Sequence, residues 1–168
     1  MAQTGSSKLT IRHELKPGDL GMIVHLHGVL YAREYGLDTT FEPYVAKPLS
    51  DFVLSGSGRL WVAEEGDRTL GSIAVVDAEE GVGQLRWFLL APEARGKGLG
   101  RRLLEAALDY CRERQFRWVY LWSFSDLDAA LALYKHAGFA ITETKRLPMW
   151  GADRTEVRMD LNLHEATR

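Results

Sequence analysis

The sequence contains a single cysteine, almost no surplus of charge of either sign, and no long hydrophobic run. The lone Cys111 excludes an internal disulfide framework and a cysteine-rich zinc site. With 21 Lys and Arg against 23 Asp and Glu, the formal net charge of −2 argues against general nucleic-acid binding, which needs a cationic surplus. No apolar run approaches the roughly 18–20 residues of a membrane-spanning helix, and residues 1–7 lack the apolar core of a signal peptide. These absences predict a reduced, cytoplasmic protein that binds neither nucleic acid nor membrane.

What is present is an ordinary globular composition, with 46% hydrophobic and 26% charged residues in 168. A chain of this length can bury about 68–70% of the surface that it exposes when unfolded, which suits one domain. We expect residues 1–7 to be a disordered start or an expression remnant, residues 8–163 to form the single domain, and residues 164–168 to be a frayed tail.

The hydrophobic spacing predicts eleven elements of secondary structure. Strands are expected at 8–13, 60–64, 69–77, 82–90, 118–122, 139–146 and 155–163, and helices at 20–35, 40–54, 98–115 and 127–137. Ser125 and Asp128 are spaced as a capping box for the last helix. The order β, α, α, β, β, β, α, β, α, β, β combines an antiparallel meander with one parallel crossover. It predicts a mixed α/β fold, with a mostly antiparallel sheet of six to seven strands and helices on both faces.

A glycine-rich loop separates the strand at 82–90 from the helix at 98–115. Gly96, Gly98 and Gly100 allow close approach of a ligand to the backbone, and the free N–H groups of a helix start can hold a pyrophosphate. The spacing fits neither the phosphate loop of nucleotide triphosphatases nor the dinucleotide fingerprint. The alternative interpretation is a glycine-rich turn with solvated charges.

Two motifs resemble the GNAT family of N-acetyltransferases. Arg95 to Gly100, after the strand end Phe88 to Pro92, resembles the family's acetyl-CoA signature Q/R-x-x-G-x-G/A. Leu133 to Phe139 resembles its second motif, L-Y-x-x-x-G-F. Leu26 to Gly36 further resembles the acetyltransferase half of bacterial MarR–acetyltransferase fusion proteins, although this chain leaves no room for the winged-helix half.

The resemblance implies the GNAT fold, acetyl-CoA as cosubstrate, no metal, and direct attack of a primary amine without an acyl-enzyme. Tyr134 would protonate the departing thiolate, although its position on an apolar stripe also suits a core tyrosine. The residues implied to bind the cofactor are Phe88, Leu89, Leu90, Arg95, Gly96, Lys97, Gly98, Leu99, Gly100 and Arg101.

The residue that accepts the amine proton is less clear, because the strand around Gln84 and Arg86 lacks the carboxylate that many family members place there. Either ordered water takes the proton, or a residue elsewhere does so. His27, Tyr31 and Glu34 can share one helix face, so Glu34 is a candidate catalytic base. Tyr31, Glu34 and Trp150 are candidates for binding the acceptor, and a solvated helix face is the alternative.

The acceptor itself is predicted only by class, as an amine of a small molecule or of a protein. A homodimer is possible. The competing function is an acyl-CoA-binding sensor or interaction module, built on the same fold without turnover.

Overall fold

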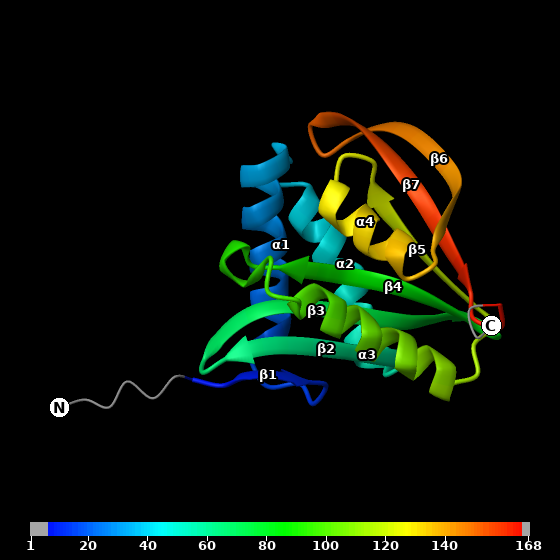
Figure 1. The fold of residues 1–168 in the computed structure, drawn as a ribbon. Helices are drawn as coiled ribbons and strands as arrows, with labels where there is room; N and C mark the ends of the chain where they lie inside the picture. The colour runs from blue at the N-terminus through cyan, green and yellow to red at the C-terminus, as the bar shows by residue number, and fades with distance from the viewer. Residues whose placement is uncertain (1–6, 166–168) are drawn as a thin grey trace.

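The computed structural model describes residues 7–165, which form a single seven-stranded sheet covered by helices on both faces (Figure 1). The predictions for residues 1–6 and 166–168 fall outside the described residues. The strands are β1 (Leu9–Arg12), β2 (Gly58–Glu65), β3 (Arg68–Glu79), β4 (Val82–Leu90), β5 (Trp118–Phe124), β6 (Ala140–Met149) and β7 (Ala152–Asn162). The helices are α1 (Asp19–Tyr35), α2 (Phe41–Ser55), α3 (Leu99–Glu113) and α4 (Asp128–His136), with a 3₁₀ turn at Pro92–Ala94.

The sheet order is β1-β2-β3-β4-β5-β7-β6. Strands β1 to β4 form the predicted antiparallel meander, and β5, β7 and β6 form a second antiparallel group. The two groups meet at the parallel β4–β5 pair, which α3 connects as the predicted crossover. In Figure 1, α3 and α4 cover one face of the sheet while α1 and α2 cover the other. The predicted fold class is therefore confirmed.

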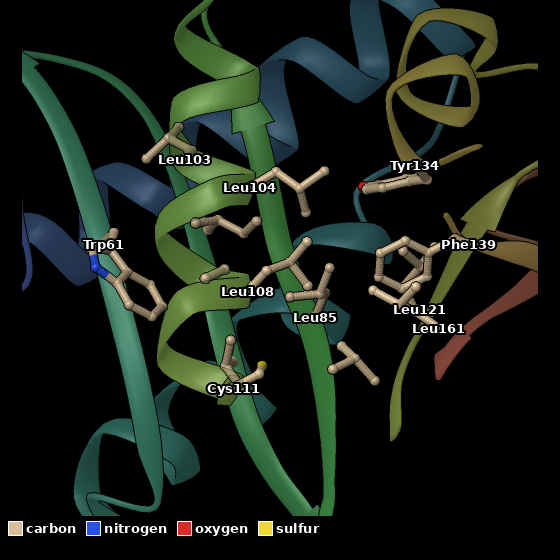
Figure 2. Close-up of a cluster of buried hydrophobic side chains, with 14 of the residues drawn as sticks. Trp61, Leu85, Leu103, Leu104, Leu108, Cys111, Leu121, Tyr134, Phe139 and Leu161 are labelled. Carbon is tan, nitrogen blue, oxygen red and sulfur yellow. The ribbon is translucent and has the colours of Figure 1, made fainter. Parts of the chain in front are cut away.

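Each face of the sheet has its own hydrophobic core. The α3 and α4 face buries the apolar stripe of α3, including Leu103, Leu104 and Leu108, against Leu85 and Leu121 (Figure 2). Cys111 belongs to this stripe, and its burial raises the pKa of the thiol to about 12. A thiol that stays protonated and buried is a packing residue and no nucleophile. The α1 and α2 face has a second core.

A β-bulge interrupts β4 in its second half. Between the pairs Ser72–Leu89 and Ala74–Arg86, β4 has one more residue than β3, and Trp87 takes a left-handed conformation with φ 48°. The Ser72 hydroxyl donates to the Trp87 carbonyl at 2.7 Å and fixes the distortion. As a result Leu85 belongs to the α3 and α4 core and Trp87 to the α1 and α2 core, although two residues on a regular strand would share a face.

Strands β4 and β5 pair only at their beginnings. The register extends over Val82–Gln84 and Trp118–Tyr120, and no later residue of β4 pairs with β5. Because β4 continues to Leu90 and β5 to Phe124, the second parts of these two strands are not hydrogen-bonded to each other. The bulge and this separation together open the sheet where the cofactor and acceptor are expected.

Candidate acetyl-CoA and acceptor site

A cavity of about 680 Å³ occupies the opening between β4 and β5. Its lining divides between the two faces of the sheet. On the α3 and α4 side it includes the glycine loop, Leu133 and Tyr134, and on the α1 and α2 side it includes Tyr44 and Trp150. The cavity therefore joins the loop predicted to bind the cofactor to the surface predicted to bind the acceptor.

The glycine loop has the backbone that the sequence analysis required. Gly96 and Gly98 have φ of 74° and 79°, in the left-handed region that disfavours other residues. A Cβ added at either position would meet no atom of the described chain within 4 Å, so the space beside both glycines is open. No side chain caps α3 at Gly98, and the bond from the Arg102 N–H to the Gly98 carbonyl is the first of the helix. The N–H groups before Arg102 thus remain available to a phosphate oxygen.

Arg95 connects this loop to α1 across the cavity. Its guanidinium donates two hydrogen bonds to the Glu34 carboxylate, at 2.5 and 3.0 Å, and two to the Leu90 carbonyl, at 3.2 and 3.1 Å. The hydrogen bonds that Arg95 donates to Glu34 raise the pKa of Arg95, which keeps its charge. Glu34 does line the cavity, but its carboxylate is already bound in this fork.

Tyr134 lies on α4 with 6% of its surface exposed. Its ring contacts Phe88 and Phe139, each with a centroid separation of 5.9 Å. In Figure 2 its hydroxyl oxygen points away from Phe139 and toward the side of α3. Within residues 7–165 this hydroxyl has no hydrogen-bond partner, and the residue lines the cavity. Burial raises the pKa of Tyr134, so the phenol is protonated at neutral pH.

On the predicted face of α1, His27 is buried and Tyr31 is partly buried, whereas Glu34 is exposed. His27 is 4% exposed, stacks on Tyr31, and donates from Nδ1 to the Ile23 carbonyl at 2.8 Å. Burial lowers the pKa of His27 to about 4, so the ring is neutral. The Tyr31 ring packs against the Phe41 ring with a centroid separation of 4.8 Å, and burial raises the pKa of Tyr31. The solvated-face alternative is therefore wrong for His27 and Tyr31.

Trp150 closes the acceptor end of the cavity from the turn between β6 and β7. Its ring packs against three other aromatic rings. The centroid separations are 4.6 Å to Tyr44, 5.2 Å to Phe41 and 5.8 Å to Phe124. Its carbonyl accepts a hydrogen bond from the Asp38 N–H at 2.9 Å, which ties the turn to the α1–α2 connection. Trp150 and Tyr31 thus belong to one aromatic cluster around Phe41, and their role in binding the acceptor stays a prediction.

Two charged residues that the sequence patterns did not indicate as site residues line the same side: Arg86 on β4 and Glu156 on β7. Glu156 is opposite Phe124 on β5 and Lys145 on β6. The alternation of β7 could have assigned Glu156 to a sheet face. Its position beside β5 depends on the order of the strands in the sheet, and the alternation of polar and apolar residues along one strand does not reveal that order.

Comparison with known proteins decides the family. The model of the acetyltransferase (GNAT) family matches residues 29–139. The chain belongs to this family. It is therefore an acetyl-CoA-dependent N-acetyltransferase by class, as the sequence motifs predicted.

Two relatives agree with this assignment, and a solved structure shares the fold. The chain is 34% identical over 113 residues to the Escherichia coli protein named "Uncharacterized N-acetyltransferase YjgM", covering 63% of this chain and 68% of that one. It is 34% identical over 122 residues to "N-alpha-acetyltransferase RimI" of Mycobacterium tuberculosis, covering 71% and 72%. The match covers only 20–49% of the length of six further relatives. The fold is similar to that of yncA from Salmonella typhimurium, a putative acetyltransferase solved with acetyl-CoA, with a TM-score of 0.75, 20% identity, and 95% and 96% of the two chains covered.

Residues 7–165 contain no group of three or more His, Cys, Asp or Glu side chains that could hold a metal ion. None of the helices in this part of the chain is both long and apolar enough to cross a membrane.

Proposed function

We propose that this chain transfers the acetyl group of acetyl-CoA to a primary amine by direct attack, without an acyl-enzyme. One observation carries the proposal. A single cavity contacts the free N–H groups of the glycine loop, the unpartnered hydroxyl of Tyr134 and the aromatic cluster around Trp150. A cofactor bound at one end and an amine bound at the other would meet inside it.

The cofactor would lie along β4 and the loop that follows. The N–H groups between Gly96 and Arg101 would bind the pyrophosphate, with Lys97 and Arg101 adding positive charge. The second half of β4, Phe88 to Leu90, has no β5 partner, so its polar backbone groups on that side can pair with the pantetheine arm. Acetyl-CoA supplies an acetyl group activated as a thioester.

The reaction needs two proton movements, because the acceptor enters as an ammonium ion. The nitrogen forms its bond to the acetyl carbon while the carbon–sulfur bond breaks. The ammonium gives up two protons, and the products are the amide, the CoA thiol and one released proton. We propose that Tyr134 donates the proton that the sulfur receives and then recovers one of the two protons that the nitrogen gives up. Its phenol is protonated, and its hydroxyl has no acceptor among residues 7–165.

We propose for Glu34 a positioning role rather than the proton-accepting role considered from the sequence. Both carboxylate oxygens of Glu34 already accept hydrogen bonds from the Arg95 guanidinium, so neither is free to approach the amine. Its pair with Arg95 fixes the loop against α1. Ordered water or the half-buried Glu156 then remains to accept the amine proton.

Several finer expectations stay predictions. They are the domain limits 8–163, the cytoplasmic location, a possible homodimer, and the resemblance of Leu26–Gly36 to the MarR–acetyltransferase fusion proteins. The RimI relative is named as an N-alpha-acetyltransferase, so a protein N-terminus is one acceptor class to test beside small amines.

The proposal is tested by measuring CoA thiol release with acetyl-CoA and a panel of amino acids, polyamines, aminoglycosides and short peptides, with product masses. We expect at least one amine to give CoA release above the amine-free rate. Its product should be 42 Da heavier than the amine, because an acetyl group replaces one hydrogen. Saturable acetyl-CoA binding with no turnover across the panel would instead support the acyl-CoA-binding module.

A further inference from the structure

Arg86 on β4 is a half-buried cation without an anionic partner. It lies before the bulge, on the α1 and α2 face, and its guanidinium stacks over the Trp87 ring at 4.6 Å. Among residues 7–165 it makes no ion pair and no side-chain hydrogen bond. Burial lowers its pKa, with Tyr44 and Tyr120 opposing that effect. A guanidinium has five N–H donors, and leaving them unpaired away from bulk water is unfavourable unless a ligand uses them.

Glu156 on β7 is the matching anion. Lys145 is directly opposite on β6, yet the two side chains do not pair within the described structure. The Lys145 ammonium instead lies 4.3 Å from the Trp122 ring centroid and 3.5 Å from the Glu143 carboxylate. Glu156 is half-buried, and this burial raises the pKa of its carboxyl. Its carboxylate therefore also lacks a partner.

The other charged residues of the lining are neutralised or lie at its exposed edge. Glu34 pairs with Arg95, Arg101 with Glu105, and Asp126 with Arg154 at 2.6 Å. Asp128 is exposed in the first turn of α4, at the cofactor end. The acceptor half therefore presents one unpaired cation and one unpaired anion that do not contact each other.

We propose that the acceptor is a small amine that also carries a carboxylate, an amino acid in the simplest case. Arg86 binds the carboxylate and Glu156 binds the ammonium that becomes acetylated. The proposal rests on the proposed function and names its substrate class. A guanidinium and a carboxylate form paired charge-assisted hydrogen bonds, which makes Arg86 selective for this group. A polyamine has no anion for Arg86, and an internal peptide chain places no carboxylate beside its N-terminal amine.

The walls around these two charges predict the rest of the ligand. Phe41, Tyr44 and Trp150 contact one another and face the same cavity. An apolar or aromatic side chain would bury against them, whereas a charged one would lose water without gaining a partner. We therefore expect phenylalanine or leucine to be better acceptors than lysine or aspartate.

The sharpest test compares phenylalanine with phenylalaninamide, which differ only in the carboxylate. We expect the acid to have the higher kcat/KM. Arg86→Gln should lower kcat/KM for the acid by roughly ten- to hundredfold, the range for a lost hydrogen bond to a charged group. It should change the amide little. Glu156→Gln should lower kcat/KM for both, because both carry the ammonium.

Arg158→Gln is the matched control. Arg158 lies on β7, two residues from Glu156, but it is already paired with Asp160 and stacked over Tyr120. The same substitution there should leave the ratio of acid to amide unchanged. Thermal unfolding of each variant verifies that it is folded.

The possible results separate this inference from the proposed function. Equal rates for acid and amide, or turnover confined to polyamines or peptides, would overturn the inference while the acetyltransferase function stands. If no amine is acetylated, calorimetry with phenylalanine in the presence of CoA decides. Binding that Arg86→Gln abolishes would support the ligand class without the reaction, and no binding would overturn both.

Discussion

Tyr134 combines a packing role with a position in the lining of the cavity. Its ring contacts Phe88 and Phe139, which accounts for the apolar spacing that makes it resemble a core residue. Its hydroxyl lines the cavity without a protein partner in the described structure. A hydroxyl kept away from internal hydrogen bonds is free to donate to a ligand atom, so the structure favours the chemical role over the purely structural one.

Tyr134→Phe tests that role, because it keeps the ring and removes the proton donor. We expect kcat to fall by on the order of 10²-fold or more, the contribution of a general acid. The Kd for acetyl-CoA should change little, since the hydroxyl acts mainly as charge develops on sulfur. Both are measured by steady-state kinetics under conditions where chemistry limits the rate, and by calorimetry.

Tyr110→Phe is the control for this substitution. Tyr110 is equally buried in the same core, on α3, and it does not line the cavity. Its loss of a hydroxyl should leave kcat unchanged. A Tyr134→Phe protein with near-normal kcat would exclude Tyr134 from proton transfer and leave solvent as the donor.

At the scale of the element, the turn at Gly96 and Gly98 that leads into α3 depends on glycine for its backbone conformation. Gly98 is the N-cap of α3 with φ 79°, and an added Cβ would face open space. Any residue other than glycine is strained there by roughly 1–2 kcal/mol, even though nothing in the described protein blocks it. A loop with these properties keeps its backbone clear for a ligand.

Gly98→Ala should therefore weaken acetyl-CoA binding by more than tenfold, which is about 1.4 kcal/mol. The added methyl would occupy space beside the N–H groups that we assign to the pyrophosphate. Gly36→Ala supplies the control, because Gly36 also has a positive φ of 69° and open space, but it ends α1 and is not part of the loop. The two variants should lose similar stability, while only the first loses affinity in calorimetry. Unchanged affinity in Gly98→Ala would contradict the placement of the cofactor.

Sequence patterns predicted the elements well because most carry a strong period. The stripe of α3 from Leu99 to Cys111 and the strand 82–90 were located almost to the residue. The predicted capping box was wrong: Leu127 is the N-cap of α4, and no side chain caps that helix. Ser125 instead uses its N–H to bond the Thr155 carbonyl, a contact between distant segments that local spacing does not contain.

The site was predictable only where it is continuous in sequence. The glycine loop and Tyr134 lie in short motifs, so they could be named directly. The bulge at Trp87 depends on the register of β4 against β3, and the ion pair of Glu34 depends on how α1 approaches Arg95. Arg86 and Glu156 share a cavity because β5 separates from β4 and pairs with β7. None of these relations has a local signature.

At the scale of the whole molecule, the cavity passes between two cores that lie on opposite faces of the sheet. The α1 and α2 core supplies the acceptor side, and the α3 and α4 core supplies Tyr134 and the start of the loop helix. The pair of Glu34 with Arg95 bridges the two layers. If this pair positions the loop as proposed, catalysis depends on α1 staying packed. The acid sensitivity of that helix then matters for the whole protein.

His27 on α1 should make the stability of the whole fold depend on pH. Its pKa is about 4 in the folded protein, against an ordinary value of 6.5, because it is buried next to Tyr31 with only the Ile23 carbonyl as partner. Between about pH 6.5 and pH 4, His27 is protonated in the unfolded chain but stays neutral in the folded chain. The free energy of unfolding should therefore decrease as the pH falls from about 6.5 to about 4, by on the order of 3 kcal/mol in total, and this loss is complete below pH 4.

Chemical denaturation at a series of pH values measures this effect, with His27→Gln as the test and the exposed His25→Gln on the same helix as the control. The carboxyls of Asp19 and Asp160 have lowered pKa values, so they also lose stabilising charge as the pH falls, mainly below pH 4. The informative quantity is therefore the difference between the curves from pH 7 to pH 4. His27→Gln should be flatter than the native chain in this range, even if it is less stable at pH 7, and His25→Gln should follow the native slope. Parallel curves for the native chain and His27→Gln would mean that the ring is protonated in the folded state, and that α1 accommodates the charge.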